Sequence, residues 1–115
     1  MWKYCDYFPL YISKKIVGRI SSDSIEKAAL NLGKLSEVDG IFISCTNLRI
    51  AKRIAFMEKV LGGKPVTSSN HALAWHALYL SGIGHTNAGD WGSLYKNIPN
   101  LQNKWYNKYH DHTLL

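Results

Sequence analysis

The stretch Asp39-Gly-Ile-Phe-Ile-Ser-Cys-Thr-Asn-Leu48 carries the strongest structural signal in this chain. Asp39-Gly40 predicts a turn, and Ile41-Phe42-Ile43 is a short apolar run typical of a strand covered on both faces in a parallel sheet. Cys45 follows at the carboxyl end of this strand. Because ligands of open α/β sheets bind at that edge, we expect functional residues in this segment.

Helices are predicted on both sides of the strand. Ser22 can cap a helix that runs through Leu35, with Asp23 in the first turn, where a carboxylate interacts favourably with the helix dipole. A second helix is predicted from about Leu48 to Leu61. The apolar stripes of the two helices are Ile25, Ala28, Ala29, Leu32 and Leu35, and Ile50, Ile54, Met57 and Leu61. The polar residues expected to face water on the second helix are Lys52, Arg53, Glu58 and Lys59.

Another strand and helix follow the glycine pair that ends the second helix. Pro65-Val66-Thr67-Ser68 is predicted to begin a strand, and Ser69 or Asn70 to cap a third helix that ends near Gly82. One side of this third helix carries Leu73, His76, Ala77 and Leu80. An additional strand is expected before residue 20.

Alternating strands and helices of these lengths predict an α/β fold with a parallel sheet. We expect a three-layer sandwich in which a short parallel sheet is flanked by helices, formed by residues 18–95. Residues 1–17 are expected to be an irregular or edge-strand segment, and residues 96–115 an irregular tail.

Composition narrows the class of protein. The 115-residue chain is 46% hydrophobic and 19% charged, as in globular domains, and it has no apolar run long enough to span a bilayer. Its amino terminus lacks a signal-peptide pattern, so we expect a cytoplasmic protein with free thiols. The net charge of +6 suits either nucleic acid or a small anionic substrate. The basic residues are dispersed, which favours the second interpretation and argues against a nucleic-acid partner.

The predicted setting of Cys45 favours a reactive thiol. A helix beginning directly after it would point the free N–H groups of residues 46–49 and the positive end of the helix dipole toward the site. Both effects stabilise a thiolate and a bound carboxylate. Thr46 and Asn47 add short hydrogen-bonding side chains. A lone cysteine is otherwise most often an inert small hydrophobe, and that interpretation stays open at this point.

Three ordered motifs resemble one enzyme family. Ile41-Phe-Ile-Ser-Cys-Thr-Asn-Leu-Arg49, Gly63-Lys-Pro-Val-Thr-Ser-Ser-Asn70 and Ala74-Trp-His-Ala-Leu78 are similar to the carboxyl-terminal half of maleate cis-trans isomerases and arylmalonate decarboxylases, in the aspartate/glutamate racemase superfamily. The upstream Gly18-Arg-Ile-Ser-Ser-Asp-Ser-Ile-Glu26 also resembles these enzymes. The resemblance extends from about Gly18 to Ile83.

The resemblance implies a cofactor-independent enzyme with two similar α/β halves that face each other across the active site. Cys45 matches the cysteine of the carboxyl-terminal half, and Thr46 and Asn47 match the turn that holds a substrate carboxylate. Asn70 is a further substrate-binding candidate. In the isomerase scheme one thiolate adds to the double bond of maleate, the resulting single bond rotates, and Cys45 exchanges the proton. A racemase or a decarboxylase of the same superfamily would use the same thiol to protonate one face of an enediolate.

The sequence departs from the family in two respects. No counterpart of the amino-terminal half, with its own cysteine, is recognisable, and Lys14-Lys15-Ile16-Val17 replaces a stretch that often contains asparagine. We therefore expect either a separate amino-terminal half or a homodimer to complete the site, and a non-catalytic remnant is the alternative. Cys5 lies in no recognisable thiol motif. No metal is expected, because His71 and His76 fall on different helix faces.

Overall fold

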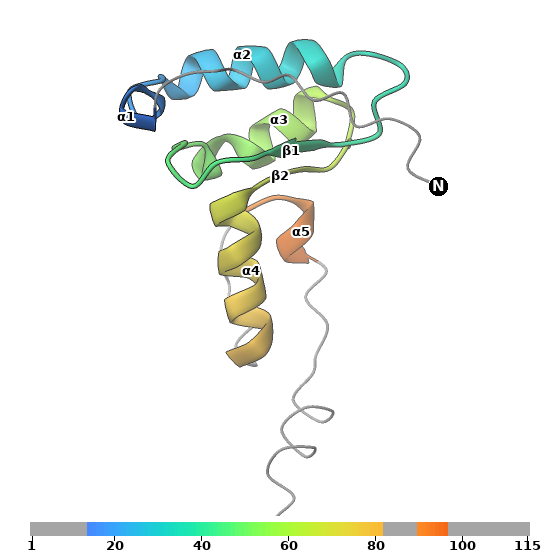
Figure 1. Ribbon diagram of the computed structural model, residues 1–115. Helices are drawn as coiled ribbons and strands as arrows, with labels where there is room; N and C mark the ends of the chain where they lie inside the picture. Colours follow the sequence, from blue (N-terminus) through green and yellow to red (C-terminus); the bar gives the residue numbers. More distant parts are fainter. Residues whose placement is uncertain (1–13, 82–89, 97–115) are drawn as a thin grey trace, which may run out of the picture.

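The structure, a computed structural model, describes residues 14–81 and 90–96, and the structural statements below concern these residues. Its elements, in chain order, are α1 (Lys14–Val17), α2 (Ser22–Gly33), β1 (Ile41–Ile43), the 3-10 turn η1 (Ala51–Arg53), α3 (Ile54–Val60), β2 (Val66–Ser68), α4 (Ser69–Ser81) and α5 (Ser93–Lys96). In Figure 1, α2 and α3 lie near the two strands, and α4 runs away from them. The described chain is therefore a mixed α/β structure, as the alternation of strands and helices predicts.

β1 and β2 form the two-stranded parallel sheet expected from the sequence. The register pairs Ile41 with Val66, Phe42 with Thr67 and Ile43 with Ser68. Alternate residues of a strand point to opposite faces, and here the first and third residues of each strand are buried. The middle residue of β1, Phe42, is 61% exposed. One face of the sheet thus contributes to the core, and Phe42 stands on the opposite face.

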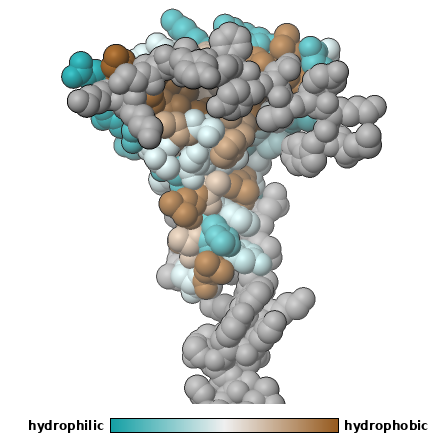
Figure 2. Space-filling view, in the orientation of Figure 1, coloured by the Kyte–Doolittle hydropathy of each residue, from teal (hydrophilic) through white to brown (hydrophobic). Residues whose placement is uncertain are grey.

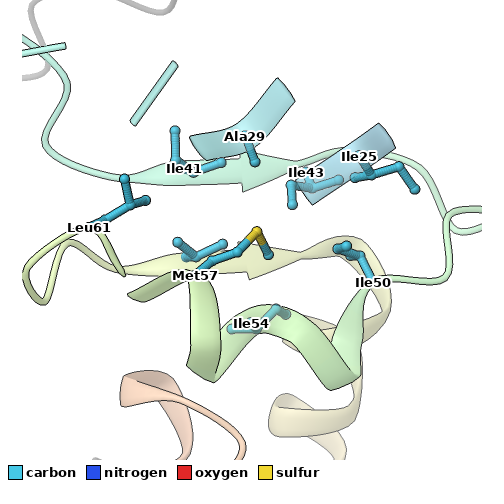
Figure 3. Packing of buried hydrophobic residues seen from close by; sticks show 9 residues of the cluster. Ile25, Ala29, Ile41, Ile43, Ile50, Ile54, Met57 and Leu61 are labelled. Atoms are coloured by element: carbon cyan, nitrogen blue, oxygen red, sulfur yellow. The ribbon is translucent and has the colours of Figure 1, made fainter. Parts of the chain in front are cut away.

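The core lies between this face of the sheet and the two helices (Figure 3). Its nine buried apolar residues are Ile25, Ala29, Ile41, Ile43, Ile50, Ile54, Met57, Leu61 and Val66. The stripe predicted for the second helix is confirmed, because all four of its members belong to this core. Burying a side chain of this size contributes roughly 1.5–3 kcal/mol.

The stripe predicted for the first helix is only partly correct. Ser21 rather than Ser22 is the N-cap, since its side chain accepts a hydrogen bond from the Ser24 N–H, and the helix ends at Gly33 rather than at Leu35. Leu35 lies beyond the helix and is exposed. Ala28 and Leu32 lie within the helix and are exposed as well. Gly33 itself is buried in the seam between α2 and the end of α3, where an added Cβ would come within 2.6 Å of Leu61 Cδ1.

The second helix begins later than predicted. Residues 48–50 have no regular structure, η1 precedes the α-helix, and α3 starts at Ile54. The physical reason is the burial of Ile50, which is 1% exposed. Its backbone is non-helical, with φ −128° and ψ −12°, so the helical segment begins only after this residue. The predicted stop is correct, because Gly62 and Gly63 both adopt positive φ after the helix.

The start of the described chain also differs from expectation. Residues 14–17 form one helical turn, α1, and residues 18–20 form a turn, so no strand is present between residue 14 and residue 20. The remainder of the predicted edge-strand segment, residues 1–13, lies outside the described residues. The predicted tail also lies outside them, except for its first residue, Lys96, which ends α5.

A buried polar cluster holds α5 against the rest of the fold. Glu58 was expected to face water, yet it is 7% exposed, and it accepts hydrogen bonds from the Val66 N–H at 3.0 Å and from the Ser93 N–H and Oγ at 2.7 Å each. The Val66 N–H, on the edge of β2 that faces away from β1, thereby finds its acceptor in a carboxylate from α3. Burial of this acid is tolerable because several donors surround it.

His71 extends the cluster from the first turn of α4. It is 1% exposed; its Nδ1 lies 2.9 Å from Thr67 Oγ1 and its Nε2 lies 2.7 Å from the Trp91 carbonyl oxygen. A carbonyl oxygen can only accept, so Nε2 carries the proton of this bond. Tyr95 donates its hydroxyl proton to the His71 carbonyl oxygen at 2.9 Å. We refer to Glu58, Thr67, His71, Ser93 and Tyr95 as the polar anchor.

Candidate functional site

The candidate site is built on the segment that leaves β1, residues 44–47, which we call the Cys45 loop. Because β1 and β2 are parallel, their carboxyl ends lie side by side, and the first residues of α4 follow directly after β2. Two hydrogen bonds join the loop to α4: the Cys45 N–H donates to Ser69 Oγ at 3.1 Å, and Asn70 Nδ2 donates to the Thr46 carbonyl oxygen at 2.8 Å. The structure therefore brings Cys45, Thr46 and Asn70 together at one edge of the sheet.

Cys45 itself is partly exposed and is a free thiol. Its backbone φ is +153°, and no other non-glycine residue of the described chain has a positive φ. Side chains rarely adopt this conformation, which costs on the order of 1–3 kcal/mol and persists only where the surrounding contacts impose it. The hydrogen bond to Ser69 is one such contact. Strained backbone of this kind is concentrated at functional sites.

The backbone donors around Cys45 differ from the predicted arrangement. The expected free N–H groups were those of residues 46–49 at a helix start, but α3 starts several residues later and the Leu48 N–H donates to the Cys45 carbonyl oxygen at 3.3 Å. The N–H groups of Thr46 and Asn47 find no acceptor among the described residues. Two adjacent unpaired amides therefore remain at the exposed loop, where they can donate to an anion.

The helix start that adjoins the loop belongs to α4 and not to α3. Ser69, the first residue of α4, accepts the Cys45 N–H, and Ser68 Oγ accepts the His71 N–H at 3.3 Å within the first turn. The positive end of a helix dipole acts within about one turn, so α4 replaces α3 as the helix that can favour an anion at this edge. The sequence offered Ser69 or Asn70 as the cap of this helix, but the capping bond comes from Ser68, and the contact of Ser69 with Cys45 was not predicted. The run Ser68-Ser69-Asn70 was the available signal.

The other predicted site residues have fewer contacts. Thr46 and Asn47 are exposed, and the side chain of neither residue forms a hydrogen bond within the described part of the chain. Asn70 is exposed as well, but one of its amide protons is already donated to Thr46. Its position is therefore that of a residue that orients the loop, and its second amide proton stays available to a ligand.

Histidines do not form a metal site in the described part of the chain. His71 is buried in the polar anchor and His76 is exposed, as expected for residues on different faces of one helix. No group of three histidine, cysteine, aspartate or glutamate residues suited to a metal ion is found within residues 14–81 and 90–96. His110 and His112 lie outside these residues.

Comparisons with known proteins add no relatives. No protein-family model matches the chain, and no curated protein or solved structure is significantly similar to it. Among the described helices none combines the length and the apolar character that crossing a membrane requires. A functional assignment therefore depends on the geometry of the Cys45 loop and on the three motifs that surround it.

Proposed function

We propose that this chain is the carboxyl-terminal half of a cofactor-independent, cysteine-dependent isomerase that acts on a small dicarboxylate, of the maleate-to-fumarate type. The observation that carries the proposal is Cys45, a partly exposed thiol on strained backbone at the carboxyl edge of a parallel sheet. It lies next to two amides that have no acceptor in the part of the chain that the structure describes. In this proposal the observed parallel strands belong to a three-layer half-domain, one of two that face each other across the site.

Cys45 is the proton donor and acceptor of the proposed reaction. A thiolate from the opposing half adds to one alkene carbon of maleate, and the Cys45 thiol gives its proton to the other carbon. The former double bond then rotates as a single bond. The Cys45 thiolate removes the proton again, and the opposing thiolate leaves as the double bond of fumarate forms.

The amides of Thr46 and Asn47 would hold one carboxylate of the substrate throughout these steps. Fixed backbone donors are suited to this task because they need no reorganisation as charge moves onto the substrate. Asn70 keeps the loop in place through its bond to Thr46. The net charge of +6 favours the approach of a dianion.

The proposal is tested by incubating the purified chain with maleate and following its conversion to fumarate by proton NMR. With two copies of the chain facing each other as the two halves, we expect turnover by the wild type. We expect a loss of at least about 100-fold in Cys45→Ser, because general acid–base groups contribute roughly 10²–10⁴-fold, and retained turnover in the matched control Cys5→Ser. Equal conversion by the wild type and Cys45→Ser, zero included, would contradict the proposal. Zero conversion by both would favour the alternative, a folded chain without activity.

A second assay separates the related reactions. In D₂O, a racemase- or decarboxylase-type enzyme would exchange or deliver a proton next to a carboxylate of a saturated substrate, while maleate would remain unchanged. Deuterium incorporation into aspartate or a 2-arylpropionate without conversion of maleate would replace the isomerase proposal by this alternative.

A further inference from the structure

One edge of β1 has no partner in the described part of the chain. Among the described residues the sheet has only β1 and β2, and Ile41 donates its N–H to the Pro65 carbonyl oxygen on the β2 side at 2.9 Å. Successive peptide groups of a strand point to opposite sides, so the N–H and the carbonyl oxygen of Phe42 point away from β2. Neither group finds a partner within residues 14–81 and 90–96. This edge of β1 can therefore pair with a further strand.

One flank of α2 is exposed beside this edge. Arg53, directly before α3, forms ion pairs with Asp23 and Glu26, so these two acidic residues mark the flank of α2 that faces α3. Ala28 and Leu32 lie on the opposite flank at helical spacing, and Leu32 is 39% exposed. Because α3 packs on β2, this opposite flank of α2 projects over the free edge of β1. Figure 2 shows apolar surface on the part of the molecule that contains α2, α3 and the strands.

The order of the elements places a strand that precedes α2 at the same edge. Both α2 and α3 cover one face of the sheet, with the core between the helices and the strands. Crossovers between parallel strands are almost always right-handed, and successive crossovers of one hand with their helices on one face add strands in one direction. The helix α3 leads from β1 to β2. A parallel strand that leads through α2 into β1 therefore lies on the side of β1 away from β2.

The start of α2 lies at the end of β1 that such a strand must reach. Ser22 Oγ donates to the Arg49 carbonyl oxygen at 2.6 Å, and the Arg49 guanidinium donates to the Gly18 carbonyl oxygen at 3.4 Å. Arg49 follows the Cys45 loop, so both contacts place the entry to α2 at the carboxyl end of β1 (Figure 1). A strand that ends there, just before α1, runs parallel to β1.

We propose that Leu10-Tyr11-Ile12 pairs with the free edge of β1 as a third parallel strand, with Tyr11 opposite Phe42. These three residues lie outside the described residues and end two positions before α1. In this register Leu10 and Ile12 lie on the core face, under the exposed flank of α2, and Tyr11 lies beside Phe42 on the other face. The Phe42 N–H donates to the Leu10 carbonyl oxygen, and the Ile12 N–H donates to the Phe42 carbonyl oxygen.

Pro9 favours this register over one that is shifted by a single residue. In the proposed register Leu10 and Ile12 bond to β1, while the backbone nitrogens of Pro9 and Tyr11 point away from the sheet. Proline has no N–H to donate, so it is tolerated at an outward position of an edge strand. A shift by one residue would turn Leu10 and Ile12 away from the core and bring Tyr11 into it.

The connection to α1 favours the chain's own segment over a second copy. Only Ser13 separates Ile12 from α1, so the pairing is intramolecular, and its effective concentration is set by a very short connection. A free edge of three residues offers a second copy far less area than a standard interface of roughly 1,600 Å². The inference goes beyond the proposed function and does not rest on it, since the strand pairs whether or not Cys45 is catalytic.

Proton NMR of the full chain at low concentration tests the pairing without any variant. We expect nuclear Overhauser contacts between the rings of Tyr11 and Phe42, and between the methyl groups of Leu10 and Leu32. The Phe42 amide should exchange with D₂O at least about 10-fold more slowly than in an unfolded chain. An unprotected Phe42 amide, or contacts of Phe42 with a different segment, would overturn the proposal. Contacts of Phe42 seen only between differently labelled chains would overturn it too, because a second copy would then occupy the edge.

Two proline variants test the register. Ile12→Pro removes the N–H that bonds to Phe42, so we expect the Phe42 amide to exchange about 10-fold faster than in the wild type. The matched control is Tyr11→Pro, at an outward position like that of Pro9, which should leave the exchange of Phe42 within about twofold of the wild type. Equal acceleration in the two variants, or a larger acceleration in Tyr11→Pro, would overturn the proposed register.

Discussion

The polar anchor and the Cys45 loop both contact one short stretch of chain, residues 66–71, but through different residues and in different surroundings. In residues 66–71, Thr67 and His71 join the anchor, while Ser69 and Asn70 bind the loop. In the anchor, Glu58 and His71 are almost fully buried and their hydrogen-bonding groups have partners. In the loop, Cys45 is partly exposed, its backbone is strained, and two neighbouring amides find no acceptor within residues 14–81 and 90–96.

From this difference we infer that the anchor residues contribute mainly to the stability of the fold and the loop residues mainly to the proposed reaction. Buried polar groups stabilise a fold when each has a partner, and removing one partner leaves the others desolvated and unpaired. Exposed unpaired donors and strained backbone cost stability and are kept where a ligand or a reaction uses them. Substitutions in the anchor should therefore lower stability, and substitutions in the loop should lower activity or even raise stability.

The largest expected effect on stability is that of Glu58→Ala. It removes the acceptor of the buried Val66 N–H and the carboxylate that the Ser93 N–H and hydroxyl bind, and we expect a loss of about 3 kcal/mol in the free energy of unfolding. Urea denaturation followed by circular dichroism measures it. Glu37→Ala, at an exposed glutamate, should leave the unfolding midpoint unchanged within error. Equal midpoints for the two variants would mean that the anchor does not stabilise the fold.

His71→Phe should have the next largest effect. Phenylalanine is of similar size, but it cannot bond to Thr67 Oγ1 or to the Trp91 carbonyl oxygen, so we expect a loss of about 2 kcal/mol. The exposed His76 provides the matched substitution His76→Phe, for which we expect a change below about 0.5 kcal/mol. Denaturation curves of the two variants measure the two losses in the free energy of unfolding. A larger loss in His76→Phe than in His71→Phe would contradict the conclusion that His71 is the histidine that stabilises the fold.

Cys45→Gly should act in the opposite direction. Relief of backbone strain is worth about 1–3 kcal/mol and the flexibility of glycine costs about 0.5–1 kcal/mol, so we expect a net gain of about 1 kcal/mol in stability. The neighbouring Ser44→Gly has no strain to relieve and should lose about 0.5–1 kcal/mol. Thermal unfolding of both variants is the measurement. A destabilised Cys45→Gly would show that the loop is not strained.

The smallest expected effect is a dependence on alkaline pH. Burial raises the pKa of the Tyr95 hydroxyl above its usual value of 10.0. A group whose pKa is raised by folding contributes its stability below the unfolded pKa and loses it as pH rises through the folded pKa. The wild type should therefore lose slightly more stability than Tyr95→Phe between neutral pH and pH values above about 10. Identical pH profiles of the two proteins would contradict this contribution.

Features that depend on the residues of a single strand or helix could be predicted from the sequence. The apolar run 41–43 predicted β1, and helical spacing predicted four core residues, of which Ile54 and Met57 lie in α3, Ile50 precedes it and Leu61 directly follows it. These two predictions needed only periodicity. Asn70 was a candidate only through the family resemblance, and its side chain does bond to the Cys45 loop at Thr46.

Features that depend on tertiary packing could not be predicted in this way. Glu58 looked like a solvent-facing helix residue, because its partners at Val66 and Ser93 are 8 and 35 residues away. The late start of α3 follows from the burial of Ile50, which outweighed local helix propensity. The packing at Gly33 is tertiary too, because a Cβ added there would come within 2.6 Å of Leu61 Cδ1.

Alkylation of Cys45 in the folded protein tests the central claim most directly. The rate of reaction with iodoacetamide, followed by peptide mass spectrometry, is compared in the presence of succinate and in the presence of acetate at equal ionic strength. A thiol beside two carboxylate-binding amides should react readily and be slowed several-fold by the dicarboxylate. A Cys45 that does not react until the protein is unfolded, or that reacts at the same rate in both salts, would contradict the account.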